Sequence, residues 1–252
     1  MIGFFRRIRK KLADDNKPMK YMRYAIGEIA LVVIGILIAL GINSTYNDYK
    51  EKKVEKTILN KLLLDIESDL EQLIDVESYY NRQLKYLKNV NNTFYNNDND
   101  SIEYYIRNGY QVANLRDINP RTSTYDEMIN SGKLYSLSNS SLTDLCIEYN
   151  VLLEKNTYET RQLRSEYKNI RSGPQMTEYW LLWFENRRDS EKASELTKSF
   201  VENKNSLAYK TLKRASGWGV SLIEGSMTRL LKIKETNLNL KEMLNSEIID
   251  KK

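Results

Sequence analysis

Hydrophobic residues form one continuous run near the amino terminus and recur at helical spacing through most of the remaining chain. From Ala25 to Ile42 the sequence reads AIGEIALVVIGILIALGI, and Glu28 is its only charged residue. A helix of eighteen residues covers about 27 Å at about 1.5 Å per residue, which is close to the hydrocarbon thickness of a bilayer. Two tyrosines precede the run and two follow it, where amphipathic rings meet membrane interfaces. The sequence therefore predicts a transmembrane helix over residues 25–42.

Two other interpretations of this run are a buried core helix and a cleaved signal peptide. A core helix would need partner surfaces on every face. A signal peptide would find small residues for cleavage at Ala39 and Gly41. However, the basic region before the run is more than twenty residues long, and the run exceeds the usual length of a signal-peptide core. We therefore favour an uncleaved signal anchor.

Residues 1–24 form a basic segment that we expect to lie in the cytoplasm. Eight Lys and Arg residues fall within residues 1–23, against five in residues 50–61 beyond the run. The positive-inside rule then places residues 43–252 outside the cytoplasm as a separate domain. A helix ending at Pro18 would lay one apolar face on the membrane surface, whereas the alternative is a loosely ordered tail that acts through its charge. The apolar residues of that face are Ile2, Phe4, Phe5, Ile8 and Leu12.

Beyond the membrane run, the apolar positions predict an all-α domain. From residue 54 to residue 90, spacings of three, four and seven mark one helical face. No Gly or Pro separates this stretch from Ile42, so we expect the transmembrane helix to continue into it. Similar patterns cover residues 142–170 and 227–248, and no strand pattern competes with them. The expected architecture is an antiparallel helical bundle. Shorter helices are predicted at 101–107, 175–186, 190–202 and 206–215.

Breaks and helix starts divide these stretches. Polar residues 91–100 predict a loop, and residues 109–124, with Pro120, predict an irregular connection that is the best candidate for a functional loop. Gly217-Trp218-Gly219 predicts a helix break. Helix starts are predicted by capping-box spacing at Thr124 with Glu127, and at Ser141 with Asp144.

Composition narrows the chemistry. The chain has no His and one Cys, Cys146, so it lacks an imidazole for proton transfer and the thiolates of a zinc site. Its net charge of +5 comes from the amino-terminal segment, because residues 43–252 hold 31 basic and 31 acidic residues. We therefore expect no catalytic residues, metal, cofactor or nucleic-acid partner. A hydrolase using two carboxylates, among residues such as Asp65, Asp69 and Glu71, is the least favoured alternative.

Two groups of residues are candidate sites. In the predicted transmembrane helix, Glu28, Gly35 and Ala39 share one face, and the small residues would let a second helix approach closely. A snorkelling carboxylate with incidental small residues is the alternative. The second group is the densest aromatic cluster, which offers either ordinary core packing, the favoured interpretation, or a binding surface. Its members are Trp180, Trp183 and Phe184, followed by Arg187 and Arg188.

Three sequence stretches resemble a known family. FFRRIRKKL (residues 4–12) and KYMRYAIGEIALVVIGILIALGIN (residues 20–43) are similar to the opening of a family of uncharacterised bacterial membrane proteins with a domain of unknown function. TYDEMINSGKLYSL (residues 124–137) is similar to a mid-chain signature of that family, and Glu28 matches its intramembrane Glu. The resemblance implies a protein of the bacterial inner (cytoplasmic) membrane with a helical extracytoplasmic region and no assigned activity.

Two functions fit these expectations. The preferred one is a membrane-anchored scaffold that binds a partner protein or self-associates. The alternative is a sensor that relays a ligand or a change in the cell envelope through its membrane helix to a partner. A sensor predicts a pocket lined by aromatic and polar residues between helices, whereas a scaffold predicts a filled interior and an exposed apolar surface.

Overall fold

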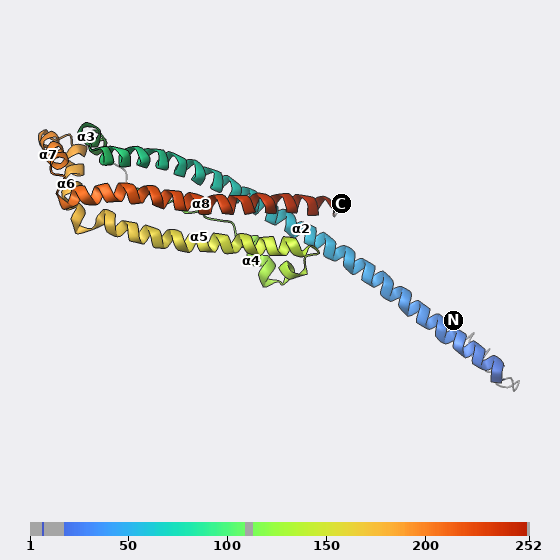
Figure 1. The fold of residues 1–252 in the computed structure, drawn as a ribbon. Helices are drawn as coiled ribbons and strands as arrows, with labels where there is room; N and C mark the ends of the chain where they lie inside the picture. Colours follow the sequence, from blue (N-terminus) through green and yellow to red (C-terminus); the bar gives the residue numbers. More distant parts are fainter. Residues whose placement is uncertain (1–6, 8–17, 109–112, 251–252) are drawn as a thin grey trace. The chain divides into compact units, whose positions relative to one another are not determined.

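Helices dominate the computed structural model, which describes Arg7, residues 18–108 and residues 113–250 (Figure 1). Within these residues there are seven α-helices and two short 3₁₀ helices, and no β-strand. The predicted all-α fold class is confirmed. The α-helices are α2 (Pro18–Asn96), α3 (Asn99–Arg107), α4 (Ser123–Asn130), α5 (Ser140–Ser172), α6 (Thr177–Arg187), α7 (Glu191–Glu202) and α8 (Leu207–Asp250); the 3₁₀ helices span Lys133–Ser136 and Pro174–Met176.

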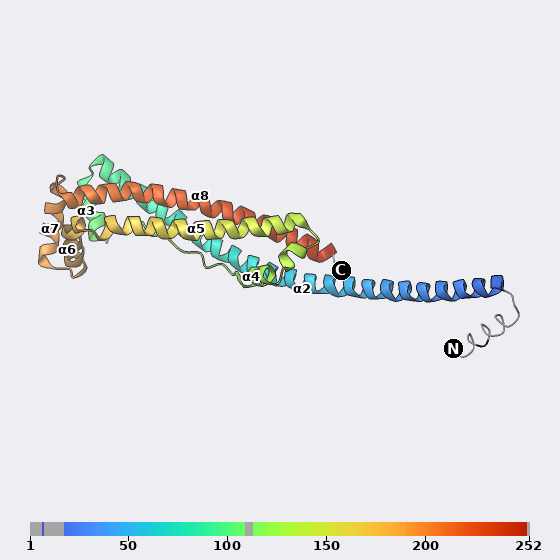
Figure 2. The ribbon, with the colours of Figure 1, turned by 90° about the horizontal axis from the view of Figure 1, so that it is seen from below.

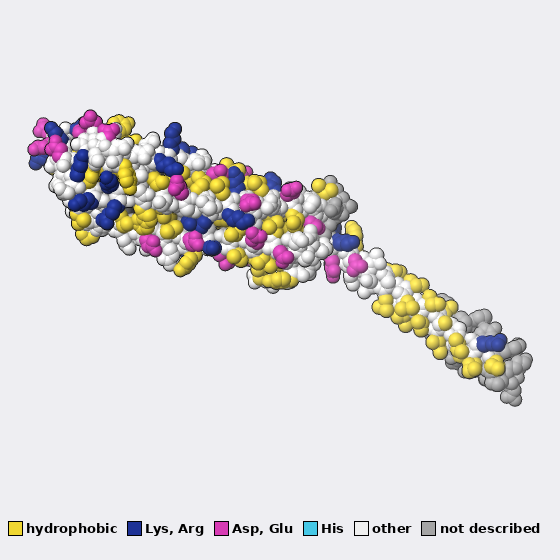
Figure 3. Space-filling view, in the orientation of Figure 1, with side chains coloured by type: hydrophobic (Ala, Val, Ile, Leu, Met, Phe, Trp, Pro, Cys, Tyr) yellow, Lys and Arg dark blue, Asp and Glu magenta, His cyan; other side chains and the backbone are white. Residues whose placement is uncertain are grey.

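The chain divides into two units, one ending at Thr57 and one covering Ile58–Lys252. The first unit holds the apolar part of α2, whose exposed hydrophobic side chains are visible in Figure 3. In the described residues, this helix alone is long and apolar enough to cross a membrane, and none of its most apolar window is buried. α2 begins at Pro18, a position that suits the first turn of a helix. The predicted amphipathic face at residues 2–12 lies outside the described residues.

In the second unit, α5, α8 and residues 58–96 of α2 pack along one another (Figures 1 and 2). We call this part the body. Its core consists mainly of leucines and isoleucines at the predicted helical spacing, and Cys146 is buried within it. The apolar faces predicted for residues 54–90, 142–170 and 227–248 therefore do form the core. The largest fully buried side chains there include Leu59, Leu73, Leu87, Met128, Leu134 and Leu142.

The predicted antiparallel arrangement is correct for α8 but not for α2 with α5. α8 runs antiparallel to both of the other long helices, whereas α2 and α5 run in the same direction (Figures 1 and 2). Two parallel neighbours need a connection that returns along the body, and residues 113–122 supply it. The sequence pattern of each helix reveals its apolar face but not its direction.

Residues 113–122 are irregular, as predicted, and they pack closely against the body. The Tyr80 hydroxyl donates to the Arg116 carbonyl at 3.1 Å and accepts from the Arg116 N–H at 3.2 Å. Arg164 binds both carboxylate oxygens of Asp117 at 2.9 Å. Ala113, Leu115 and Ile118 are buried. This connection is a fixed part of the body, and the predicted residues 109–112 lie outside the described part of the chain.

A second core lies where α2 ends and α8 begins. We call it the end cluster; it includes α3, α6 and α7. Aromatic rings dominate it: Phe94 and Tyr209 meet edge to face with 5.5 Å between ring centroids, and Phe200 lies 5.9 Å from Tyr209. Its other buried members are Val90, Ile102, Ile106, Met176, Tyr179, Leu182, Val201, Ala208 and Leu212.

One predicted break is shorter than expected, and another is wrong. The loop predicted at residues 91–100 shrinks to Asn97 and Asp98, because α2 continues to Asn96 and buries Phe94. Asn97 takes a positive φ of 53°, and the Asp98 side chain then caps α3. Gly217-Trp218-Gly219 does not interrupt α8, which is continuous over Leu207–Asp250.

The predicted helix starts are displaced by a few residues. α4 begins at Ser123 after Thr122, and Thr124 lies inside it with its hydroxyl bonded to the Asp65 carboxylate. α5 is capped by Asn139, whose side chain accepts the Leu142 N–H at 3.2 Å. Both helices exist as predicted, but the capping boxes proposed at Thr124 and Ser141 are wrong.

Candidate functional site

The first candidate site, on the membrane helix, has the predicted geometry of a helix face. Glu28, Gly35 and Ala39 all lie in α2, and offsets of seven and four residues place them on one side of it. A Cβ atom added to Gly35 would have no neighbour within 4 Å in the chain. The face therefore has room for a second helix, and helix association through it stays a prediction.

The second candidate site, on α6, is divided between packing and exposure. Tyr179 and Leu182 are buried and set the inward face of the helix. Trp180 and Trp183 pack partly against the end cluster. Phe184 is 52% exposed, so the expected common burial of the three predicted aromatic residues is wrong. The inward face is formed by Tyr179 and Leu182, which each precede one of the predicted residues Trp180 and Trp183.

Aromatic contacts order the outer side of α6. Trp183 meets Trp180 and Phe184 at centroid distances of 5.7 Å and 5.1 Å, both edge to face. The Arg187 guanidinium lies 4.9 Å from the centre of the Trp183 ring, in a cation–π contact. Arg188 is exposed at the end of the helix. We call Leu181, Trp183, Phe184, Arg187 and Arg188 the α6 surface.

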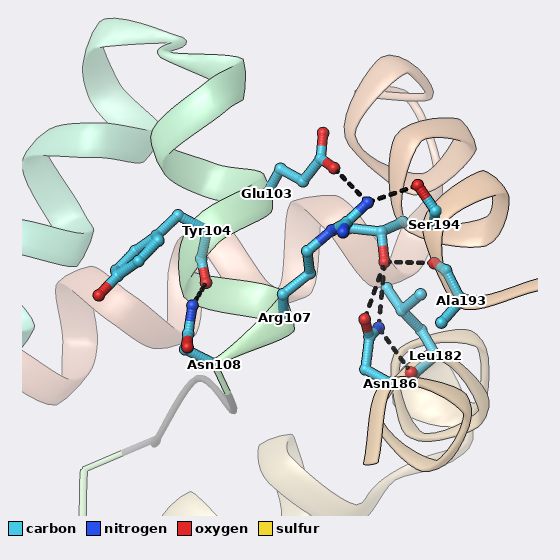
Figure 4. Close-up of polar contacts among 9 residues, drawn as sticks. Glu103, Tyr104, Arg107, Asn108, Leu182, Asn186, Ala193 and Ser194 are labelled. Carbon is cyan, nitrogen blue, oxygen red and sulfur yellow. Dashed lines mark hydrogen bonds and ion pairs between the residues drawn. The ribbon is translucent and has the colours of Figure 1, made fainter. Parts of the chain in front are cut away.

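Polar contacts join α6 to α7 and α3 to α7 (Figure 4). The Asn186 amide donates to the Leu182 carbonyl at 2.9 Å and to the Thr197 hydroxyl at 3.0 Å. Arg107 of α3 pairs with Glu103 at 2.7 Å and donates to the Ser194 hydroxyl of α7 at 2.5 Å. The helix that carries the α6 surface is therefore held against α7.

A groove between α2 and α8 has no counterpart in the sequence predictions. Its volume is about 830 Å³, within the usual range for small-molecule sites. Asn91 and Tyr95 of α2 form one wall and α8 forms the other. Figure 3 shows both Lys or Arg and Asp or Glu side chains over the end of the unit where α6, α7 and the start of α8 lie, so the charge of the groove is judged from its own lining. We call this groove between α2 and α8 the cationic groove. Its lining residues are Asn91, Tyr95, Leu207, Lys210, Lys213, Arg214, Gly217, Trp218, Val220 and Ser221.

The lining of the cationic groove holds three cations and no carboxylate. Lys213 lies 5.1 Å from the centre of the Tyr95 ring. Within the described part of the chain, Lys210, Lys213 and Arg214 form no ion pair. The nearest carboxylate along the exposed side of α8, Glu224, is paired with Lys88 at 2.8 Å. The groove therefore carries uncompensated positive charge.

Asp69, one of the carboxylates of the hydrolase alternative, takes part in a buried polar network. Asp69 accepts the Arg121 N–H at 2.9 Å and the Tyr149 hydroxyl at 3.0 Å. Asn237 donates to the Tyr149 oxygen and to the Ile66 carbonyl, both at 3.0 Å. Burial raises the pKa of Asp69, while its two hydrogen bonds act in the opposite direction. The network links α2, α5 and α8.

The other two carboxylates of the hydrolase alternative, Asp65 and Glu71, differ in burial. Asp65 is buried and accepts from Thr124, and Glu71 is exposed on α2. Among the described residues, no group of His, Cys, Asp and Glu side chains is arranged to hold a metal ion. Asp65 bonds α2 to α4, and Asp69 bonds α2 to α5 and to the connection at Arg121.

The chain matches neither a curated protein nor a solved structure. A family model does match it, over residues 28–169, which is more than half of its length. The match runs from Glu28 in the apolar part of α2 through nearly all of α5, so it includes most of the predicted membrane helix, the returning connection and the Thr124–Leu137 stretch. The chain belongs to the family described as a family of unknown function, DUF6090.

Proposed function

We propose that the protein is a membrane-anchored interaction protein whose helical domain binds a partner protein through the α6 surface. The observation that carries the proposal is the combination of exposed apolar and cationic side chains on a rigid helix. Leu181 and Phe184 are 56% and 52% exposed, beside the stacked Arg187. Trp and Arg side chains are frequent among the residues that dominate binding energy in interfaces.

The same surface indicates the chemistry of the partner. Arg187 is already oriented by Trp183, so less side-chain freedom is lost when it binds a carboxylate. Arg188 adds a second cation beside it. We infer a partner surface that offers an apolar patch bordered by Asp or Glu side chains.

We further propose that α2 anchors the protein in a bacterial inner membrane with its amino terminus in the cytoplasm. Support comes from the exposed apolar run of α2 and from the excess of Lys and Arg before it. The face formed by Glu28, Gly35 and Ala39 would add a contact within the membrane, either with a second copy or with a partner helix. This role is one of binding and requires no catalytic residue.

Crosslinking in the native membrane, followed by purification of the full-length chain in mild detergent, tests the interaction. The informative variant is F184A/R187A, and its matched control is Y158A/R161A, which removes an exposed tyrosine and an exposed arginine from α5. We expect a specific partner to be reduced by about tenfold or more with F184A/R187A and to be retained with the control. Equal recovery with both variants contradicts the α6 surface.

A further variant separates the membrane contact from the α6 surface. G35L places a large side chain on the face of Glu28 and Ala39, where the chain itself leaves open space. Loss of crosslinks between copies with G35L, but not with F184A/R187A, assigns self-association to the membrane helix. Unchanged crosslinks in G35L contradict that contact.

The sensor is the second candidate function, and the cationic groove favours it. The groove combines aromatic and polar side chains between two helices, which is the kind of site that a sensor requires. Its ligand would bind α2 and α8 together, and α2 is also the helix that carries the predicted transmembrane segment.

A further inference from the structure

We propose that the cationic groove binds an organic anion, a molecule with a phosphate-like group joined to an aromatic or other apolar body. This inference rests on the sensor role and names its ligand class. It does not depend on the α6 surface, so either proposal can fail without the other.

The positive charge of the groove supplies the anion site. Lys210 and Arg214 are four residues apart on α8 and therefore project from the same side of the helix. Both are exposed, and neither has an ion-pair partner among the described residues. Lysine and arginine donors form the strong, charge-assisted hydrogen bonds that phosphate oxygens accept. Lys213 completes a group of three cations at one end of the groove.

The opposite end of the groove suits an uncharged body. Trp218 lies four residues beyond Arg214, and Val220 and Ser221 follow it along the groove wall. Tyr167 packs against the Trp218 ring with 5.3 Å between centroids, which limits the orientations of the indole. A planar or apolar group can stack there without displacing a charged side chain.

Exposed apolar side chains border the cation end as well. Tyr95 is 67% exposed and Leu207 is 61% exposed, and both line the groove. Lys213 lies against the Tyr95 ring, so apolar and cationic groups are adjacent at this end of the groove. An amphipathic ligand would cover both kinds of surface at once.

The groove is formed before any ligand arrives. The Ser216 hydroxyl donates to the Lys213 carbonyl at 2.7 Å and lies 3.2 Å from the Asn91 side-chain oxygen, so α8 and α2 are in close polar contact beside the groove. A Cβ atom at Gly217 would lie 3.2 Å from the same Asn91 oxygen, so the glycine permits this close approach. Binding then requires little rearrangement of the backbone.

These features orient the ligand along α8. Its anionic group lies against Lys210 and Arg214, and its body extends toward Trp218 and Ser221. From residue 210 to residue 221 the helix rises about 16 Å, which sets the length of molecule that the groove accommodates. The chemistry suits both soluble aromatic phosphates and short phospholipids, and the test distinguishes these sources.

Isothermal titration calorimetry on the purified full-length chain in an uncharged detergent tests the proposal. The probes are 1-naphthyl phosphate and dihexanoyl phosphatidic acid, with inorganic phosphate and 1-naphthol as the separate halves of the first. We expect at least one of the two amphipathic anions to bind more tightly than inorganic phosphate by about tenfold or more. The tighter of the two identifies the source class.

Matched charge variants assign that binding to the groove. K210Q/R214Q removes two groove cations, and K192Q/K198Q removes two exposed lysines from α7. We expect K210Q/R214Q to weaken binding by about tenfold or more, and K192Q/K198Q to change it by less than about twofold. Equal affinity of K210Q/R214Q and the unaltered protein overturns the proposal. An equal loss in both variants also overturns it, because net charge alone would then explain the binding.

Trp218 provides an independent test of the apolar end. W218L should weaken binding of 1-naphthyl phosphate by about fivefold or more while leaving inorganic phosphate unaffected. Helicity measured by circular dichroism verifies that each variant is folded. Unchanged affinity of folded W218L for every probe contradicts the orientation described above. Because no partner protein is present, these outcomes are separate from those of the crosslinking experiment.

Discussion

The body and the end cluster use different means to hold their helices. In the body, a buried polar network crosses the apolar core through Asp69, Tyr149 and Asn237. In the end cluster, aromatic rings fill the interior and its ion pair lies at the margin. Long helices with repeating apolar faces can slip by one turn and still bury similar surfaces, so directional bonds are needed to specify their register. The short helices of the end cluster pack through a few large side chains, and Asn186 adds a hydrogen bond to the buried Thr197 between α6 and α7.

The largest expected effect is the loss of an aromatic ring from the end cluster. F94A removes a side chain that is 1% exposed and meets Tyr209 edge to face. We expect it to lower the free energy of unfolding by about 3–5 kcal/mol. L181A changes an exposed side chain of the α6 surface and should lower the free energy of unfolding by less than about 0.5 kcal/mol. Urea denaturation of the full chain measures both; similar losses would mean that the rings do not determine this core.

A single hydroxyl in the body should have a smaller but clear effect. Y149F removes the hydroxyl that donates to Asp69 and accepts from the Asn237 amide. We expect a loss of about 1–3 kcal/mol in unfolding free energy, because two buried polar groups lose a partner. Y158F changes an exposed tyrosine on the same helix and should be neutral. A neutral Y149F would show that apolar packing alone sets the register.

Two carboxylates, one from each region, should respond to pH in opposite directions. Burial raises the pKa of Asp69, so the folded state keeps a proton that the unfolded state has lost, and its contribution to stability falls as pH rises above about 4. Bonds from the Ser101 hydroxyl and N–H lower the pKa of Asp98, whose contribution is lost as pH falls.

The variants D69N and D98N separate these contributions. Unfolding free energies measured between about pH 3 and pH 7 should show the unaltered protein losing stability relative to D69N as pH rises. Relative to D98N, it should gain stability over the same range. The same slope for both variants would contradict the assignment of burial to one carboxylate and capping to the other.

The smallest effect belongs to the margin of the end cluster. Arg107 is 42% exposed and joins Glu103 to Ser194 of α7. We expect R107A to cost less than about 1 kcal/mol, since partly exposed ion pairs contribute little. A loss above about 2 kcal/mol in the same denaturation experiment would show that directional bonds specify the end cluster as they do the body.

The sequence predicts what depends on periodicity and misses what depends on contacts between distant residues. The apolar faces of α2, α5 and α8 follow from their spacing alone. The loop predicted at residues 91–100 is too long, because residues 91–96 remain helical. Val90 and Phe94 are buried in the end cluster and hold this last part of α2 in place. Local polarity could not reveal that burial.

The same limit concealed the cationic groove. The expected break at Gly217-Trp218-Gly219 separated Lys210 and Arg214 from Trp218, although continuous α8 places all three on one side. Gly219 serves a close approach instead: a Cβ there would lie 3.1 Å from the Ala113 Cβ and 3.2 Å from the Tyr167 hydroxyl oxygen. The density of aromatic residues in the sequence identified the candidate residues of α6. Which of them are exposed depends on the face of α6 that the end cluster covers.

The burial of Cys146 bears on the redox behaviour of the protein. The thiol is 1% exposed, and burial raises its pKa to about 12. The thiolate is the form that reacts with oxidants and thiol reagents, and a raised pKa makes this form scarce near neutral pH. While the protein is folded, burial of the Cys146 thiol therefore slows its oxidation and its exchange with other thiols. Labelling of the Cys146 thiol requires α5 to separate from the rest of the body. The rate of labelling therefore measures how often the body opens.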